Sequence, residues 1–242
     1  MRSEPKAVVL LSGGLDSSTV LYLAKSRGFR CFCLAFDYGQ RHKKEIKAAK
    51  EIAQSARVDL RVIKIALPWK GSALLDRGIS IPRATKSPFG LVRLRSPQVA
   101  QGKPSHQDIK KIPATYVPAR NIIFLSFALS YAEAINAQAL FIGAHAQDYS
   151  GYPDCRPEFY QAFRRVVSSG TKSGIEKRKI QIKTPLIGKK KAEIVRLGAK
   201  LGVPFRLTWS CYRGRAKPCG ACDSCYYREK GFQEAGMTDP LR

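Results

Sequence analysis

The sequence has no apolar run long enough to cross a bilayer, and its first residues have no hydrophobic region of the kind that secretory signals contain. Acidic residues are scarce: 18 Asp and Glu stand against 43 Lys and Arg in 242 residues, a formal net charge of +25. We therefore expect a cytoplasmic protein with no membrane partner. Its positive field attracts nucleotides and anionic substrates, and leaves nucleic acid open as a partner.

The chain also lacks the lysine of a Walker loop, because no Gly-Lys-Ser/Thr follows its first glycines. In its place, residues 12–18 read Ser-Gly-Gly-Leu-Asp-Ser-Ser. They follow an apolar run at 7–11 that predicts a buried strand and precede a helix predicted at 19–25. Such a turn is an anion site, in which the amides of residues 13–18 and the hydroxyls of Ser12, Ser17 and Ser18 would face a phosphate. An ordinary strand-to-helix turn with a serine cap is the alternative.

Further predicted strands and helices alternate along the chain. The strands are expected at 30–36, 60–65, 139–144 and 180–182, and the helices at 43–57, 122–135, 157–168 and 190–201. This alternation predicts an α/β fold, with a parallel sheet covered by helices on both faces, over residues 1–205. Two stretches differ: a basic, proline-containing insertion at about 68–113, and a polar segment at about 168–180 that predicts a flexible surface loop.

Seven cysteines suit thiols or metal ligands in a reducing compartment better than disulfides. Four of them lie close together near the C-terminal end: Cys211, Cys219, Cys222 and Cys225. Four thiolates around one Zn²⁺ make a structural site, which would hold residues 206–242 as a small zinc subdomain. An iron–sulfur cluster or a redox pair is the alternative. Cys31 and Cys33 are expected in the core, and Cys155 in a polar loop.

These patterns together resemble one family. Ser-Gly-Gly-x-Asp-Ser is similar to the pyrophosphate loop of the ATP-pyrophosphatase (PP-loop) superfamily. Further matching segments lie at 37–42, 116–121, 148–159 and 210–214, and the last is the four-cysteine segment with Gly231-Phe232. With them the chain resembles the QueC family of 7-cyano-7-deazaguanine synthases. The resemblance covers nearly the whole chain apart from 68–113 and 168–180.

The resemblance implies a Rossmann-like fold of the adenine nucleotide alpha hydrolase type and a homodimer. It also implies an ATP-dependent carbon–nitrogen ligase that converts 7-carboxy-7-deazaguanine and ammonia to 7-cyano-7-deazaguanine (preQ0), in queuosine or archaeosine biosynthesis. The acid would be adenylated, ammonia would displace AMP to give the amide, and the amide would then be adenylated at its oxygen. ATP with Mg²⁺ is the co-substrate and Zn²⁺ the structural metal. The catalytic residues implied are Ser12, Asp16, Ser17 and Arg120.

Binding residues are carried over in the same way. The nucleotide contacts implied are Leu11, Ser12, Gly13, Gly14, Leu15, Asp16, Ser17, Ser18, Thr19, Val20, Leu21, Gln40, Arg120 and Gly143. The substrate contacts implied are Tyr116, Asp148, Tyr152, Asp154, Arg156, Glu158 and Phe159. For Asp16 a helix N-cap is the alternative role, and Asp154 and Arg156 have the alternative of pairing with each other.

Two departures from the family pattern leave alternatives open. Ala119 stands where the family often has glycine, and the segment 168–179 is longer and more basic than the family pattern. The second departure leaves open an enzyme that passes the activated acid to another amine. A PP-loop tRNA-modifying ligase and a non-enzymatic basic zinc protein that binds nucleic acid are the remaining alternatives.

Overall fold

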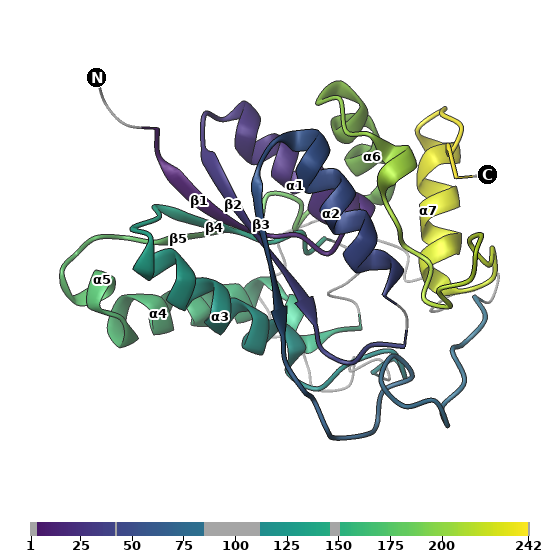
Figure 1. Ribbon diagram of the computed structural model, residues 1–242, viewed down its shortest axis with the longest axis horizontal. Coiled ribbons are helices and arrows are strands. Elements are labelled where there is room, and N and C mark those ends of the chain that lie inside the picture. The colour runs from purple at the N-terminus through teal and green to yellow at the C-terminus, as the bar shows by residue number, and fades with distance from the viewer. Residues whose placement is uncertain (1–3, 42, 85–111, 146–150, 242) are drawn as a thin grey trace, which may run out of the picture.

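A five-stranded parallel sheet forms the centre of the computed structural model, which describes residues 4–41, 43–84, 112–145 and 151–241 (Figure 1). The strands run in the order β3-β2-β1-β4-β5, and every neighbouring pair is parallel. The predicted parallel sheet is therefore confirmed. Its strands are β1 (Lys6–Leu10), β2 (Arg30–Asp37), β3 (Asp59–Lys64), β4 (Ala139–Phe141) and β5 (Gln181–Lys183).

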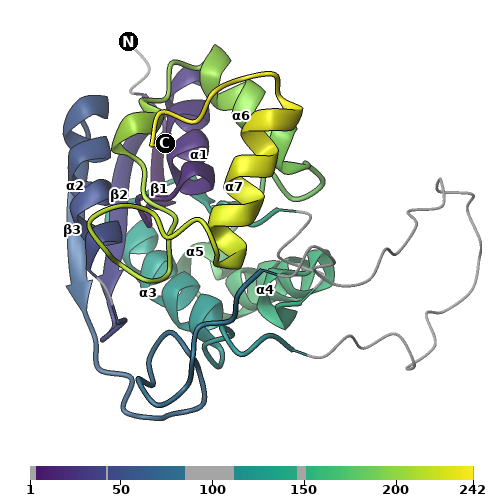
Figure 2. The same ribbon diagram turned by 90° about the vertical axis from the view of Figure 1, so that its right-hand side faces the viewer.

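Helices cover both faces of this sheet (Figures 1 and 2). One layer holds α1 (Leu15–Ser26), α2 (Lys44–Ala56), α6 (Lys191–Lys200) and α7 (Asp223–Glu234). The other layer holds α3 (Arg120–Ala134), α4 (Pro157–Gly170) and the short α5 (Lys172–Ile175). Among the residues described, none of the helices has the length and apolarity to cross a membrane.

Strand β1 shows why its sequence is apolar throughout. Successive side chains point to opposite faces, so Ala7 and Val9 pack under the α1 layer while Val8 and Leu10 pack under the α3 layer. A strand that is buried on both faces needs a continuous apolar run rather than an alternating one. The run at 7–11 satisfies this requirement and places the turn that follows at the carboxyl edge of the sheet.

The strand order also locates the ligand edge. From β1 the chain moves outward through β2 and β3, and then returns to the other side of β1 for β4 and β5. The carboxyl ends of β1 and β4 therefore border the point at which the direction of winding reverses, where open α/β sheets bind ligands. The residues that leave these two strands, 11–14 and 142–145, are thereby brought side by side.

Three expectations need correction. Helix α1 begins at Leu15 rather than residue 19, so much of the predicted turn is the first helical turn. Where a loop was expected at 168–180, α4 continues to Gly170 and α5 follows, because Thr171 accepts a hydrogen bond from the Gly174 amide at 3.0 Å and caps the new helix. Cys155 lies in a buried 3-10 turn (Pro153–Cys155), with 5% of its surface exposed, rather than in a polar loop.

The C-terminal segment shares the core of the α/β layer. The ring of Phe232 packs edge-on against Phe205 at 5.2 Å, and α7 lies along α6 (Figure 2). The Trp209 amide donates to the carbonyl of Gly13 at 2.8 Å. A division at residue 205 stays a prediction. The expected insertion is described only at residues 68–84 and 112–113, and its Ala84 amide donates to the carbonyl of Ala221, which lies within the four-cysteine segment.

Candidate active site

The turn between β1 and α1 is held close to α2 by a glycine. Gly13 has φ +79°, and a Cβ at this position would lie 2.4 Å from the carbonyl oxygen of Glu45. No side chain fits there without displacing α2. The Ser12 amide donates to the Ser17 hydroxyl at 3.2 Å, and the two serine hydroxyls lie 3.0 Å apart. These contacts close the turn, so that α1 begins with its N-terminus facing the edge of the sheet.

The first amides of α1 are oriented for an anion. The N-cap residue, Gly14, makes no side-chain cap bond. The first intrahelical bond runs from the Ser18 amide to Gly14 at 3.0 Å, so the amides of Leu15, Asp16 and Ser17 precede it and have no intrahelical partner. The Ser18 hydroxyl also donates to Gly14, at 2.8 Å. Both donors of Ser18 are thus used inside the helix. The three earlier amides have no intrahelical partner and can donate to a ligand.

The end of β4 comes very close to these amides. A Cβ at Gly143 would lie 3.1 Å from the Ser17 nitrogen and 3.2 Å from the Asp16 carbonyl carbon. Glycine at this position therefore keeps the approach to the helix N-terminus open. The prediction that Gly143 belongs to the site now has a steric reason, although a contact with nucleotide stays a prediction.

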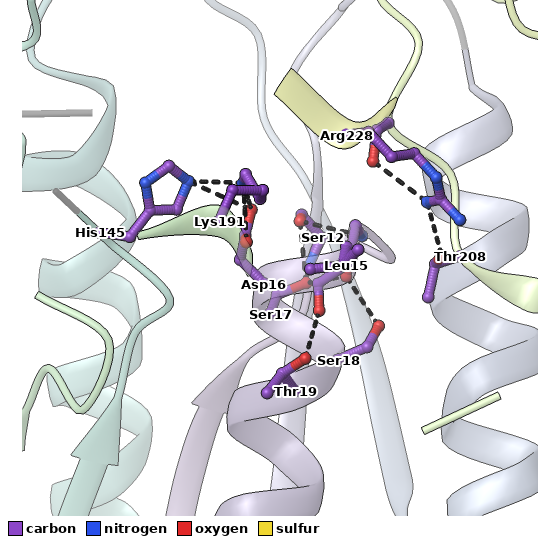
Figure 3. A network of polar contacts seen from close by, with 12 residues as sticks. Ser12, Leu15, Asp16, Ser17, Ser18, Thr19, His145, Lys191, Thr208 and Arg228 are labelled. Carbon is purple, nitrogen blue, oxygen red and sulfur yellow. Dashed lines mark hydrogen bonds and ion pairs between the residues drawn. The ribbon is translucent and has the colours of Figure 1, made fainter. Parts of the chain in front are cut away.

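Asp16 belongs to a buried charged cluster (Figure 3). The Lys191 Nζ lies 2.8 Å from each Asp16 carboxylate oxygen and 2.8 Å from His145 Nε2, and His145 Nε2 lies 3.4 Å from Asp16 Oδ2. Burial opposes ionisation of Asp16, but its contacts with Lys191 and His145 outweigh burial and hold its pKa well below the usual range. Asp16 is thus an ionised residue that ties α1 to α6, and Gly14 takes the N-cap position.

A cavity of about 260 Å³ opens between this turn and the neighbouring elements. Its floor is formed by the ends of β1, β2 and β4. Ser12, Gly14, Asp16 and Ser17 line one side, and Tyr38, Glu45 and Arg120 line another. The C-terminal segment also lines the cavity, with Trp209, Ser210, Tyr212 and Ser224. All four predicted catalytic residues, Ser12, Asp16, Ser17 and Arg120, therefore line one cavity.

Arg120 contributes a positive charge to this cavity, and the residue that precedes it has an unusual backbone conformation. It is the first residue of α3, and its guanidinium lies 5.9 Å from the ring centres of both Tyr38 and Phe124. One of its nitrogens donates to the Tyr38 hydroxyl at 3.4 Å. The preceding residue, Ala119, has φ +52°, in the left-handed region that favours glycine. Alanine at this position therefore places backbone strain beside Arg120.

The predicted aromatic residues fall into two groups. Tyr152 lines the cavity and shares a hydrogen bond of 2.6 Å with the Thr115 hydroxyl. The Tyr116 hydroxyl accepts from the Ala119 amide at 3.0 Å, and its ring lies 6.2 Å from that of Tyr152. Phe159 instead packs beside Tyr160 and Phe163 in the core under the sheet. Tyr152 is therefore the predicted aromatic side chain that faces the site.

Several other predicted contacts are placed in structural roles. Asp154 is buried, and its carboxylate accepts from the Asn121 amide at 2.9 Å at the start of α3. Gln40 is buried and bonded to the protein through both atoms of its amide. Glu158 is exposed in the first turn of α4, and Arg156 is the N-cap of that helix. Leu15, Thr19, Val20 and Leu21 are buried in α1, while Leu11 lines the cavity floor; Asp148 lies outside the described residues.

Sequence reasoning missed Lys191 and Glu45. Lys191 opens α6, 175 residues after Asp16, and nothing in the local sequence predicts that its ammonium group is buried against Asp16. Glu45 sits in the first turn of α2 within a run of charged residues that is typical of a solvated helix face. The contribution of Trp209 to Ser224 to the cavity was missed as well, because the sequence predicted only a structural metal site for this segment.

The four predicted metal ligands come together. The Sγ atoms of Cys211, Cys219, Cys222 and Cys225 all lie within 4.8 Å of one another. The amides of Cys219 and Arg213 donate to the Cys211 sulfur at 3.3 and 3.4 Å, which favours a thiolate there. The donor set is all sulfur, so the cluster can hold a soft metal ion or an iron–sulfur centre.

Comparison with known proteins decides the family. The family model described as queuosine biosynthesis protein QueC matches residues 6–236. The chain belongs to the QueC family. Among curated relatives, the 7-cyano-7-deazaguanine synthase of Trichodesmium erythraeum is 50% identical over 98% of this chain and 99% of its own length. The same-named proteins of Thermoplasma volcanium (49% identical, 98% and 90% covered) and Nostoc sp. (51% identical, 98% and 96% covered) match equally far along the chain.

Membership of the QueC family agrees with the motifs from which the resemblance was inferred. The pyrophosphate-type turn, the segments around Arg120 and Tyr152 and the four cysteines all lie within the matched residues. The structure brings the first three to one cavity and places the cysteines behind its wall. The alternative of a non-enzymatic basic zinc protein is therefore set aside.

Proposed function

We propose that this protein converts 7-carboxy-7-deazaguanine and ammonia to 7-cyano-7-deazaguanine at the expense of ATP, in 7-deazapurine biosynthesis. The observation that carries the proposal is the open helix N-terminus of α1 inside the 260 Å³ cavity, in a chain about half identical to synthases of that name. A carboxylate reacts poorly with ammonia because its oxygen is a poor leaving group. Transfer of AMP to that oxygen gives a mixed anhydride, from which ammonia displaces AMP and forms the amide.

The phosphates of ATP would lie against the turn. The amides of Leu15, Asp16 and Ser17 donate to the departing pyrophosphate, and the positive end of α1 stabilises its growing charge. Arg120 lines the same cavity, and its guanidinium would contact a phosphate or the substrate carboxylate. Mg²⁺ bound with ATP would neutralise phosphate charge, and Asp16, through its contact with Lys191, would orient the turn.

The substrate ring would lie against aromatic side chains that line the cavity. Tyr152 and Tyr212 both line the cavity and offer flat apolar surfaces for stacking. A second adenylation, now at the amide oxygen, allows loss of AMP and a proton to leave the nitrile. Both activations use the same turn, so the amide is reactivated without leaving the cavity. For the remaining predicted substrate contacts, which include Asp148, the proposed role is supported only by the resemblance to the family.

We assign Zn²⁺ to the four cysteines, because an all-sulfur, four-ligand set matches its structural sites. Bound zinc would hold the wall formed by Trp209, Ser210 and Tyr212 in place. No chemical step passes through it. Thiolate ligands also need a reducing environment, which supports a cytoplasmic location.

A homodimer is proposed as well. Helix α3 carries two exposed apolar side chains, Ile122 and Phe127, each 43% exposed. Val166 of α4 and Ile175 of α5 extend the same layer at 53% and 72% (Figure 1). A second copy of the chain would cover this apolar surface. Sedimentation of the wild type and of a Phe127→Asp variant would give a dimer and a monomer, respectively.

Mass spectrometry of one reaction tests the proposed activity. Purified protein with the deazapurine acid, ATP, Mg²⁺ and ammonium should give free nitrile. An amide or acyl adenylate that accumulates while an added amine is coupled would instead support transfer to another acceptor. Acid left untouched, with salt-sensitive binding of tRNA, would support a tRNA-modifying ligase and overturn the proposal.

A further inference from the structure

Glu45 lines the cavity, but phosphate binding does not explain its presence there. It lies in the first turn of α2, and its side chain lines the same cavity as Asp16, Ser17 and Arg120. Phosphate repels a carboxylate, so Glu45 must serve another ligand or serve the fold. Its surroundings distinguish these two roles.

A buried amide fixes one oxygen of Glu45. Gln40 Nε2 donates to Glu45 Oε1 at 2.8 Å and to the Phe36 carbonyl at 3.1 Å, while Gln40 Oε1 accepts from the Tyr38 amide at 2.8 Å. Gln40 is only 5% exposed, so it holds the carboxylate in a fixed orientation. No hydrogen bond or ion pair to Glu45 Oε2 is found among the residues that the structure describes.

The other cavity carboxylate is already neutralised. Both oxygens of Asp16 contact the Lys191 ammonium group. The groups that face Glu45 are Arg120 from α3, Asp37 at the end of β2, and Tyr38. Asp37 is paired with Lys43 at 2.9 Å, and the neighbouring Lys44 turns away to the ring of Trp209. Among the described carboxylates that line this cavity, Glu45 Oε2 is therefore the oxygen left to accept from a small donor or to bind a cation.

The geometry points to Glu45 as the binding site of the amine co-substrate: its Oε2 holds ammonia beside the adenylated acid and takes up a proton as the new bond forms. This inference rests on the proposed function, and it assigns within that function a site for one substrate. The ligand class is a small amine, since the group must fit beside the substrate and donate to one oxygen.

The step balances as follows. The nitrogen lone pair of ammonia forms the carbon–nitrogen bond at the acyl carbon. The carbon–oxygen bond to AMP breaks, and its electron pair leaves with the AMP phosphate. One N–H proton passes to Glu45 Oε2, so the products are the amide, AMP and a protonated Glu45 that returns its proton to water. Arg120 is placed to balance the charge of the departing phosphate.

The acidity of Glu45 fits this role. Burial raises its pKa to about 7, against the opposing effects of Arg120 and Gln40. A carboxylate of ordinary acidity would be a weaker proton acceptor. A group that titrates near neutral pH is half in its accepting form there, and is reset by solvent after each turnover.

Glu45→Gln tests the inference, with Glu51→Gln as the matched control. Glu51 lies on the same helix with 40% of its side chain exposed, paired with Lys47 across one turn. The first measurement is the burst of pyrophosphate from acid and ATP without ammonium. We expect this burst to persist in both variants, because the adenylation step does not use Glu45.

The second measurement is the rate of amide formation against ammonium concentration. For Glu45→Gln we expect kcat/KM for ammonium to fall by about 100-fold, as for loss of a general base, with the KM for ATP unchanged. The control should behave as the wild type. Glu45→Asp, which keeps the charge on a shorter side chain, should recover part of the loss, and this separates the amine role from a general effect on folding.

The pH profile gives a readout that a merely structural role would not move. Below the pKa of Glu45, near 7, the wild-type rate with ammonium depends on two deprotonations, of ammonium and of Glu45. The logarithm of kcat/KM should rise with a slope of about two there and about one above, while Glu45→Gln should show about one throughout. A wild-type burst with unchanged ammonium kinetics in Glu45→Gln would overturn the amine site alone. A wild type without a burst would overturn the proposed function itself.

Discussion

Two walls of one cavity are built by different means. The wall from Ser12 to Ser17 is set by the sheet, because a buried strand, a glycine turn and a helix N-terminus fix its backbone. The second wall, from Trp209 to Tyr212, follows no regular element, and the four cysteine sulfurs next to it form a cluster with few apolar neighbours. The first wall is stable wherever the α/β core folds. The second requires a metal and a few buried polar contacts.

This difference orders the predictions. Substitutions in the four-cysteine cluster and the residues around it should cost the most stability. Substitutions at the sheet edge should cost activity with less loss of stability. If both walls responded alike, the distinction between them would be wrong.

The largest effect is expected for Cys222→Ser, which removes a fully buried sulfur of the cluster. Structural zinc contributes on the order of 10 kcal/mol of binding free energy in small zinc domains, so its loss should unfold the wall. The zinc content measured by metal analysis should fall to near zero per chain. The melting temperature should fall as well, and no nitrile should form. Cys31→Ala is the control, since Cys31 is buried in β2 away from the cluster and should keep the metal. A Cys222→Ser protein that retained zinc and activity would refute the account of this wall.

The next effect concerns a buried ion pair beside the same wall. Arg228 donates to both oxygens of Asp239, at 2.7 and 2.9 Å, and to the Thr208 hydroxyl at 2.8 Å. Asp239→Leu leaves this guanidinium without its partner, and the free energy of unfolding should fall by about 3–5 kcal/mol. Adding Arg228→Met should restore part of that loss, because no charge is then stranded. Urea unfolding of the three proteins measures the difference, and strict additivity of the two changes would contradict it.

At the sheet edge, Asp16→Asn should cost activity more than stability. Lys191 loses its charged partner, so unfolding should become easier by about 1–3 kcal/mol, while nucleotide release with acid and ATP should fall by about 100-fold. Because the folded pKa of Asp16 is lowered, its ion pair stabilises the wild type above the unfolded pKa, near 3.8, and is lost as pH falls below it. The melting temperature of the variant should therefore depend less on pH in that acidic range. Equal slopes in wild type and variant would exclude the pair.

The smallest effect is expected for Ala119→Gly. The left-handed φ of +52° costs alanine about 1 kcal/mol, and the extra freedom of an unfolded glycine offsets part of the gain. We expect the free energy of unfolding to rise by about 0.5 kcal/mol at most, with activity unchanged because Arg120 keeps its place. A clear loss of stability would mean that the left-handed conformation carries no strain.

The sequence predicted the first wall better than the second for a physical reason. Buried strands and glycine turns impose local patterns, so the strand and the glycine turn at residues 7–14 could be assigned from neighbouring residues alone, although the helix begins four residues earlier than predicted. The four cysteines were found because metal ligands have a recognisable spacing. Lys191, Glu45 and Trp209 were missed because their roles depend on side chains that lie far away in the sequence.

Oxygen transfer tests the central claim, that the β1–α1 turn serves adenylation of a carboxylate. The deazapurine acid, labelled with ¹⁸O in both carboxylate oxygens, is converted in the presence of ATP and ammonium, and the nucleotide and phosphate products are analysed by mass spectrometry. The account predicts that each oxygen leaves in AMP, one atom per AMP, with none in pyrophosphate or phosphate. Label in inorganic phosphate, or nitrile formed with unlabelled AMP, would contradict it.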